Sequence, residues 1–209
     1  FRLDGIEVPA AWSQVATDIM VSKYFRRAGV PQVNPDGTPK LNPDGTPVLG
    51  GETSARQTIR RLVLAWRWWG ERYGYFATPQ DAETFTDEMT YMLIHQIASP
   101  NSPQWFNTGL KLAYDISGPP QGHWYVDQET KELRQSEDAY TRAQAHACFI
   151  QSVQDAILGD GGIMDLVERE ARIFKYGSGT GTNFSTLRAE GEPVSAGGIA
   201  SGLMSWLRS

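Results

Sequence analysis

The sequence is poor in cysteine and histidine: its 209 residues include one cysteine, Cys148, and three histidines. A single thiol forms no disulfide within the chain. We therefore expect a reducing, cytoplasmic setting, in which any disulfide needs a partner cysteine from outside this segment. His146 and Cys148 would share one face of a strand, but zinc needs three or four protein ligands. Because the other histidines are His95 and His123, far apart in sequence, we expect no metal site.

Long apolar runs and an excess of positive charge are also lacking. No stretch approaches the roughly 20 residues of a membrane span, and no signal-peptide pattern opens the chain. The formal net charge is -5, whereas a nucleic-acid groove needs a basic surface to neutralise phosphates. We therefore expect neither a membrane nor a nucleic acid as a partner. With 40% hydrophobic residues, the composition is that of a globular protein with one large or two smaller domains.

Three stretches in the first hundred residues have the apolar spacing of amphipathic helices. The residues that mark their expected limits are Pro9 and Gly29 for the first, Thr53 or Ser54 and Tyr73 for the second, and Thr78 and Pro100 for the third. The second helix carries Trp66, Trp68 and Trp69, a residue type that also stacks on nucleic-acid bases. Because Lys and Arg are not clustered beside them, we expect these tryptophans to belong to a helical core.

The hexapeptide Asn-Pro-Asp-Gly-Thr-Pro occurs at 34–39 and again at 42–47. Each copy holds a Pro-Asp-Gly turn, because proline presets φ and glycine accepts a positive φ. Two turns eight residues apart predict a small surface hairpin or loop. A binding motif is the alternative interpretation, and we favour a solvated connector.

From Asn101 onward, turns alternate with short apolar runs. The expected elements are a hairpin around 125–130, a buried strand at 146–150, a helix over 161–176, a glycine-rich turn at 177–181, a strand at 182–187 and a last helix opened by Gly197 and Gly198. Strand, helix, strand and helix predict an α/β domain with a crossover connection. We therefore expect a helical lobe over residues 1–100 and the start of an α/β core over 101–209.

Three residues of this second half have side chains suited to chemistry. A cysteine on a buried strand is usually an apolar filler, but Cys148 precedes a glycine-rich segment that lets backbone approach a ligand. That segment joins a helix to a strand, the reverse of the dinucleotide fingerprint, so a helix end with a tight turn is the alternative. Asp155 has the carboxylate for ribose hydroxyls and Arg188 the guanidinium for phosphate, although each alone is more often a surface charge.

Seven segments of the chain carry motifs in a fixed order: 12–26, 52–57, 101–107, 136–142, 146–152, 170–181 and 201–205. Among them are Asn-Ser-Pro-Gln-Trp-Phe-Asn at 101–107 and His-Ala-Cys-Phe-Ile-Gln-Ser at 146–152. Taken together, they resemble the adenosylcobalamin-dependent, class II ribonucleotide reductases over nearly the whole chain. The duplicated turn at 34–47 is the main stretch without a counterpart in that pattern.

The resemblance implies a ten-stranded α/β barrel behind an N-terminal helical region, of which this chain would hold the helical region and the first part of the barrel. It also implies a radical mechanism: homolysis of the cobalt–carbon bond generates a thiyl radical, which takes the ribose 3′ hydrogen. Two further cysteines then reduce the 2′ position and become a disulfide. By motif position, Cys148 looks like the first of that reducing pair, whose recycling needs an external dithiol.

The resemblance assigns roles to further residues. Ser102 would contact the substrate phosphates, and Ala147 with Cys148 would line the ribose pocket. Gly179 and Gly181 would belong to the loop between the substrate and effector sites, Gly179 on the substrate side and Gly181 on the effector side.

At the effector site, Asp155 would contact the ribose of a deoxynucleotide or ATP and Arg188 its phosphate. Because the family binds its effector at a dimer interface, a homodimer is expected, with a thioredoxin-like reductant as a further partner. The substrate is a ribonucleoside diphosphate or triphosphate, and the resemblance favours the diphosphate.

Both ends of the chain look cut: it begins at Phe1 without a methionine and stops inside an expected helix. We therefore expect an N-terminal part, with the thiyl cysteine, the second reducing cysteine and most of the adenosylcobalamin site after Ser209. The alternative function is an inactive nucleotide-binding regulatory fragment. A helical adaptor would fit residues 1–100 alone and leave the Cys148 region unexplained.

Overall fold

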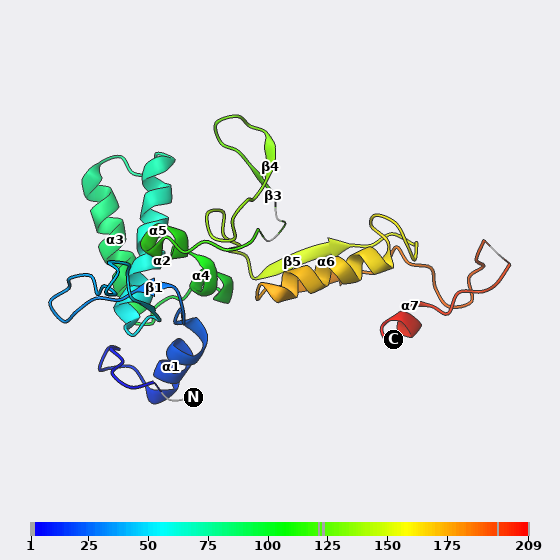
Figure 1. Cartoon of the computed structure of the whole chain (residues 1–209). Coiled ribbons are helices and arrows are strands. Elements are labelled where there is room, and N and C mark those ends of the chain that lie inside the picture. Colours follow the sequence, from blue (N-terminus) through cyan, green and yellow to red (C-terminus); the bar gives the residue numbers. More distant parts are fainter. Residues whose placement is uncertain (1–2, 121, 123, 196, 209) are drawn as a thin grey trace. The chain divides into compact units, whose positions relative to one another are not determined.

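The computed structural model describes residues 3–120, 122, 124–195 and 197–208, so that His123 lies outside the described residues. The chain divides into two compact units, Phe1–Ala145 and His146–Ser209 (Figure 1). The domain boundary that we expect near residue 100 concerns the family's domains and stays a prediction. Within the described residues, no helix is long and apolar enough to cross a membrane.

The first helical stretch is shorter than the sequence predicts. Helix α1 spans Gln14–Ile19, with the Ser13 hydroxyl capping its start, and continues as the π-helix η1 over Met20–Tyr24. The expected end at Gly29 is wrong, because the buried Phe25 already has an extended backbone and turns the chain away from the helix. The short strand β1, Val30–Pro31, follows.

The next two helices begin where the capping signals predict. Helix α2 spans Ala55–Arg72 and helix α3 spans Pro79–Ile94, and the two lie side by side (Figure 1). Ser54 caps α2 in a capping box with Gln57, and Thr78 caps α3 in one with Asp81. Each box satisfies backbone N–H groups that have no partner inside the helix, which sets the first residue of each helix.

The duplicated hexapeptides form two turns of a surface hairpin, as predicted. Strand β1 pairs antiparallel with β2, Leu49–Gly50, and the chain between them makes two further bridges. In each copy the aspartate side chain accepts hydrogen bonds from the backbone N–H and the hydroxyl of the threonine two residues later, Asp36 from Thr38 and Asp44 from Thr46. Each copy therefore closes its own turn.

Two short helices follow Asn101, where the sequence analysis predicts only turns and apolar runs. Helix α4 spans Ser102–Asn107, capped by the Asn101 side chain, and α5 spans Leu110–Tyr114. Gly109 separates them with a φ of 79°, a backbone conformation that favours glycine. The expected hairpin is present, formed by β3, Trp124–Val126, and β4, Leu133–Gln135.

The main hydrophobic core belongs to the first unit. It joins η1, α2, α3 and α4 through eight buried side chains: Met20, Val21, Phe25, Ile59, Leu62, Val63, Leu93 and Trp105. Trp66 packs against this cluster, Trp68 is exposed and the Trp66 indole N–H donates to Gln104. Trp69 is half-buried, so of the three tryptophans only Trp66 contacts the core cluster as predicted, and Trp68 does not.

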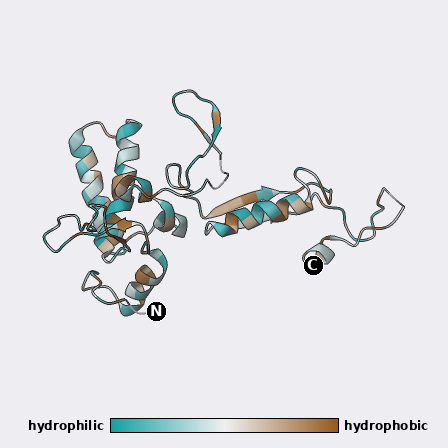
Figure 2. Cartoon of the chain, in the orientation of Figure 1, coloured by the Kyte–Doolittle hydropathy of each residue, from teal (hydrophilic) through white to brown (hydrophobic). Residues whose placement is uncertain are grey.

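The second unit contains the predicted strand–helix–strand crossover. Strand β5, Cys148–Ser152, is followed by helix α6, Ile163–Lys175, and by strand β6, Gly179–Asn183, which pairs parallel with β5. In Figure 2 the first part of β5 is brown, hydrophobic, and its end is teal, hydrophilic. The mixed helix and strand structure agrees with the predicted α/β class, and the described residues form no closed sheet, as expected for the start of a barrel.

Three predictions for this unit are wrong in detail. The second strand begins at Gly179 and not at 182, because the glycines themselves pair with β5. The last helix, α7, spans Leu203–Trp206 and begins after Gly202, whose backbone conformation is not helical, and not at Gly197. Strand β5 is not buried, since Cys148 at its start is exposed.

Candidate functional site

Cys148 is the first residue of β5, and its thiol is exposed. Its partner in the parallel register is Gly179, the first residue of β6. The Gly179 N–H donates to the carbonyl oxygen of Ala147 at 2.6 Å. The structure thus brings together the three predicted substrate-side residues of this unit. Because register partners present their side chains on the same face, the missing side chain of Gly179 leaves space beside the Cys148 thiol.

Of the two interpretations of the glycine-rich segment, the structure shows the helix end with its tight turn, whereas a ligand-binding role stays a prediction. Gly177, at φ 83°, follows the end of α6 and forms the expected helix end and turn. Gly179 and Gly181 lie in β6, where a Cβ would meet the nearest atom at 3.8 Å and 3.6 Å, respectively. These are ordinary contact distances, so packing within the described chain does not require glycine at either position.

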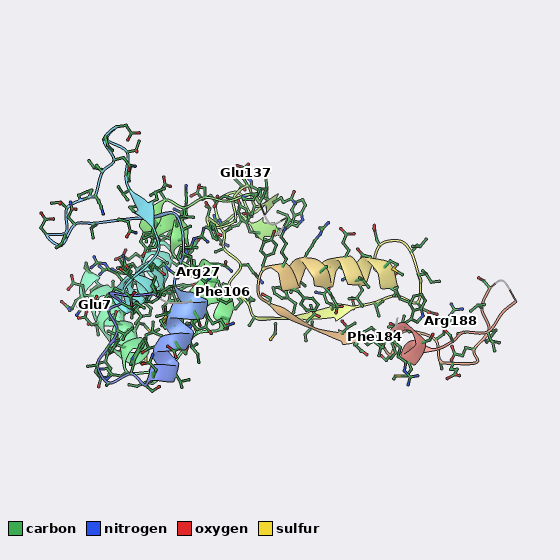
Figure 3. The ribbon with its side chains drawn as sticks, turned by 60° about the horizontal axis from the view of Figure 1, so that its bottom comes forward. Glu7, Arg27, Phe106, Glu137, Phe184 and Arg188 are labelled. Atoms are coloured by element: carbon green, nitrogen blue, oxygen red, sulfur yellow. The ribbon has the colours of Figure 1, made fainter. Side chains whose placement is uncertain are left out.

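Asp155 and Arg188, predicted separately for ribose and phosphate, contact each other. Arg188 Nε lies 2.7 Å from Asp155 Oδ2, and its Nη1 donates to the carbonyl oxygen of Pro193 (Arg188 is labelled in Figure 3). The hydrogen bond from Arg188 holds the pKa of Asp155 below its ordinary value. The carboxylate therefore stays ionised and remains a hydrogen-bond acceptor.

This ion pair lines a cavity of about 370 Å³ within the second unit. Apolar side chains, Ile157 and Trp206 among them, and the Ser195 residue complete its lining. Gly181 is not among the described lining residues, so the structure groups two of the three predicted effector residues around one cavity.

Ser102 belongs to the first unit, where it opens helix α4. Its side chain is half-buried, and its hydroxyl oxygen lies 3.1 Å from the hydroxyl oxygen of Tyr24. The sequence analysis does not identify Tyr24 as a site residue, although the tyrosine falls in one of the recognised segments. The pairing of two residues 78 positions apart has no signature in their spacing.

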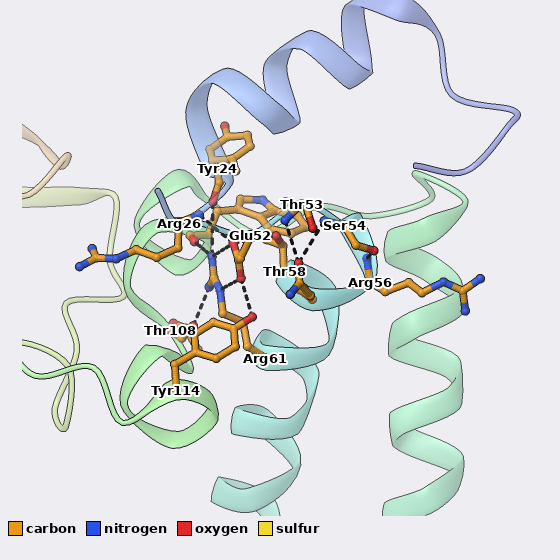
Figure 4. Close-up of polar contacts among 12 residues, drawn as sticks. Tyr24, Arg26, Glu52, Thr53, Ser54, Arg56, Thr58, Arg61, Thr108 and Tyr114 are labelled. Carbon is orange, nitrogen blue, oxygen red and sulfur yellow. Dashed lines mark hydrogen bonds and ion pairs between the residues drawn. The ribbon is translucent and has the colours of Figure 1, made fainter. Parts of the chain in front are cut away.

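A buried ion pair that the sequence analysis also misses supports this region (Figure 4). Arg61 Nε lies 2.8 Å from Glu52 Oε1, and the two side chains are 1% and 0% exposed. Glu52 also accepts hydrogen bonds from the Thr58 and Tyr114 hydroxyls and from the backbone N–H of Arg26. Burial, followed by the neighbouring Glu52 charge, raises the pKa of Tyr114 well above its ordinary value, so its phenol stays protonated and donates.

The guanidinium of Arg61 connects α2 to α4. It donates to the carbonyl oxygens of Trp105 at 2.7 Å and Thr108 at 2.8 Å. These bonds hold the C-terminal half of the short helix against α2. Because a buried charge is tolerated only when it is paired and hydrogen-bonded, Glu52 and these carbonyls together make the position of Arg61 possible.

The two described histidines, His95 and His146, belong to different compact units. His95 caps the end of α3 and packs against the Tyr91 ring at 4.2 Å, whereas His146 lies in the second unit. Among the residues that the structure describes, no group of three or more His, Cys, Asp and Glu side chains is arranged to hold a metal ion.

Two family models match the chain. A model described as class II vitamin B12-dependent ribonucleotide reductase matches residues 1–96, and one described as the ribonucleotide reductase barrel domain matches residues 146–209. The barrel match begins at the first residue of the second compact unit.

Curated relatives named vitamin B12-dependent ribonucleotide reductase match the chain over its full length. The chain is 53% identical to the protein of Agrobacterium fabrum, 52% to that of Bradyrhizobium diazoefficiens and 42% to that of Rhodopirellula baltica. In each case, all of this chain aligns with 18% of the relative. The chain thus spans about a fifth of the length of the proteins it matches.

Proposed function

Because this chain belongs to the class II vitamin B12-dependent ribonucleotide reductases, we propose that it is the N-terminal part of an enzyme that reduces ribonucleotides to 2′-deoxyribonucleotides. The observation that supports this function best is the exposed thiol of Cys148, with the side-chain-free Gly179 as its register partner. A reducing cysteine must be open both to the ribose and to the dithiol that regenerates it.

In the proposed reaction, the thiols of Cys148 and a second cysteine outside this chain are oxidised to a disulfide. The C2′–O bond of the ribose breaks, the hydroxyl leaves as water, and a C2′–H bond forms in its place. One external dithiol, such as a thioredoxin-like protein, then reduces the disulfide by exchange. Ala147 and Gly179 leave room for the ribose beside the thiol, and Ser102 donates its hydroxyl to the substrate phosphates.

The cavity at Asp155 and Arg188 is the proposed effector site for a deoxynucleotide or ATP. Its ionised carboxylate suits ribose hydroxyls, and a guanidinium suits phosphate oxygens, so the ion pair holds two complementary groups at one cavity. Gly179 and Gly181 lie in strand β6 and not in a loop, because both pair with β5. We propose that this strand lies between the substrate and effector sites, with Gly181 on the effector side.

Further proposals concern the complete protein. Adenosylcobalamin is the proposed cofactor and supplies the initiating radical when bound. The described residues lack a cluster of metal-ligating side chains, and we assign none of them to the cofactor. We also propose a ribonucleoside diphosphate substrate, a homodimer, a cytoplasmic location, an N-terminal helical domain over residues 1–100 and the first part of the barrel over 101–209.

The test uses the complete protein and the 209-residue chain side by side. Each is incubated with a ribonucleoside diphosphate, adenosylcobalamin and a dithiol, and deoxynucleotide is counted. We expect product from the complete protein, dependent on both cofactor and dithiol, and none from the 209-residue chain. If the complete protein binds deoxynucleotides but forms no product, it is a regulatory protein and the proposal is wrong. Product from the 209-residue chain would contradict the proposed incompleteness.

A further inference from the structure

The hydroxyl of Tyr24 is the side-chain group hydrogen-bonded to Ser102, at 3.1 Å. Tyr24 ends η1 and Ser102 opens α4, so the contact joins two elements that are distant in sequence. Both residues are half-buried, and the contact between their hydroxyls is only partly buried.

The ring of Tyr24 contacts two aromatic rings of α4. It stacks on Trp105 with the ring centroids 5.6 Å apart, and it packs against Phe106 at 5.5 Å. Aromatic pairs at such distances add to the stabilisation from burial, so the ring has a defined orientation. Its hydroxyl therefore points at Ser102 because of the packing, whether or not the hydrogen bond forms.

The backbone on both sides of the contact is held by one guanidinium. Arg61 Nη2 donates to the Trp105 carbonyl oxygen at 2.7 Å and to that of Tyr24 at 3.4 Å (Figure 4). The buried guanidinium of Arg61 thus holds η1 and α4 together near the contact between the Tyr24 and Ser102 hydroxyls.

A hydroxyl has one proton to donate and two lone pairs to accept with, and its proton rotates freely unless a neighbour restricts it. A phenol, with a pKa of about 10, is a better donor than an aliphatic alcohol. When Tyr24 donates to Ser102, the serine proton must point elsewhere and is available to an anionic oxygen. We infer that Tyr24 is a positioning residue, which orients the Ser102 hydroxyl towards the phosphate of the ribonucleotide; this inference rests on the proposed function.

The test is the Tyr24→Phe variant of the complete protein, which keeps the stacked ring and removes the hydroxyl. Because one oriented hydrogen bond is lost, we expect the KM for the ribonucleoside diphosphate to rise roughly 3- to 10-fold while kcat is unchanged. The matched control is Tyr140→Phe, since Tyr140 is also half-buried in the same unit and its hydroxyl accepts from Arg26. The control should leave KM unchanged.

A double variant shows whether Tyr24 acts through the Ser102 hydroxyl or only stabilises the surrounding structure. In a Ser102→Ala background, Tyr24→Phe should raise KM no further, because the hydroxyl that it orients is already gone. An unchanged KM in Tyr24→Phe, an equal rise in Tyr140→Phe, or a further rise in the double variant would each overturn the inference.

If the complete protein is not a reductase, the role of Tyr24 can still be tested by substrate binding. If the wild-type protein forms no deoxynucleotide, the dissociation constant of the ribonucleoside diphosphate replaces KM in the same comparison. Weaker binding by Tyr24→Phe than by Tyr140→Phe would then support the role of Tyr24, and equal binding would overturn it.

Discussion

Arg61 shows how one charged side chain can organise a small helical unit. Its guanidinium is nearly inaccessible to water, yet it makes an ion pair with Glu52 and hydrogen bonds to carbonyl groups of α4. Glu52 in turn accepts from Tyr114 and Thr58, so the negative charge is also fully hydrogen-bonded. The pair stabilises this arrangement of helices because removing either partner leaves a buried charge uncompensated.

Replacing Arg61 with methionine tests this role in the 209-residue chain. We expect the free energy of unfolding to fall by about 3–5 kcal/mol, because the Glu52 carboxylate stays buried without its cation. The control, Tyr114→Phe, removes one hydrogen bond to the same carboxylate and should cost about 1.5–3 kcal/mol. Urea denaturation of the three proteins measures both values. An Arg61→Met variant no less stable than Tyr114→Phe would show that the ion pair contributes nothing beyond a hydrogen bond.

The sequence indicates the individual groups at this scale but not their partners. Cys148, Asp155 and Arg188 can be selected because their side chains suit redox, ribose and phosphate chemistry. The contact between Asp155 and Arg188, and that between Tyr24 and Ser102, depend on how distant segments pack, and residue spacing does not encode it.

At the scale of elements, capping residues predict helix starts better than apolar periodicity predicts short helices. Ser54 and Thr78 mark the starts of α2 and α3 because their side chains bond the first free N–H groups. Helices α4 and α5 have six and five residues, too few for a 3.6-residue period to repeat. Strand β6 starts at glycines, which have low strand propensity, and its pairing with β5 outweighs that propensity.

The turn between α4 and α5 supplies a matched pair of glycine substitutions. Gly109 and Gly37 both have a φ near 80°, but a Cβ at Gly109 would lie 2.1 Å from the Arg61 carbonyl oxygen, whereas one at Gly37 meets nothing within 4 Å. Gly37→Ala should cost about 1–2 kcal/mol from the left-handed backbone alone. Gly109→Ala should cost a further 1–3 kcal/mol or so, because the close contact forces the backbone to shift.

Thermal or urea unfolding of the two alanine variants measures this difference. Equal destabilisation would show that the close packing of α2 against the α4–α5 turn is not needed for stability. A larger cost at Gly37 would contradict the account of both turns.

At the scale of the whole molecule, the two compact units differ in how much apolar surface they bury. The main core lies in the first unit, whereas in the second the α6 residues Val167 and Phe174 are 56% and 54% exposed, with Leu166 buried. The sequence predicts a helix over 161–176, and of these three apolar side chains of α6 only Leu166 is covered within the described residues. We expect the other strands and helices of a complete barrel to cover the rest, since the chain matches 18% of its relatives' length.

The measurement that tests the central claim most directly compares the complete protein with its Cys148→Ala variant. Deoxynucleotide is counted with a ribonucleoside diphosphate, adenosylcobalamin and a dithiol, while cofactor homolysis is followed by its absorbance. A Ser152→Ala variant, at the other end of β5, serves as the control. We predict that Cys148→Ala loses dithiol-dependent turnover but still homolyses the cofactor, and that Ser152→Ala keeps both. Full turnover by Cys148→Ala would contradict the assignment of this thiol to the reducing pair.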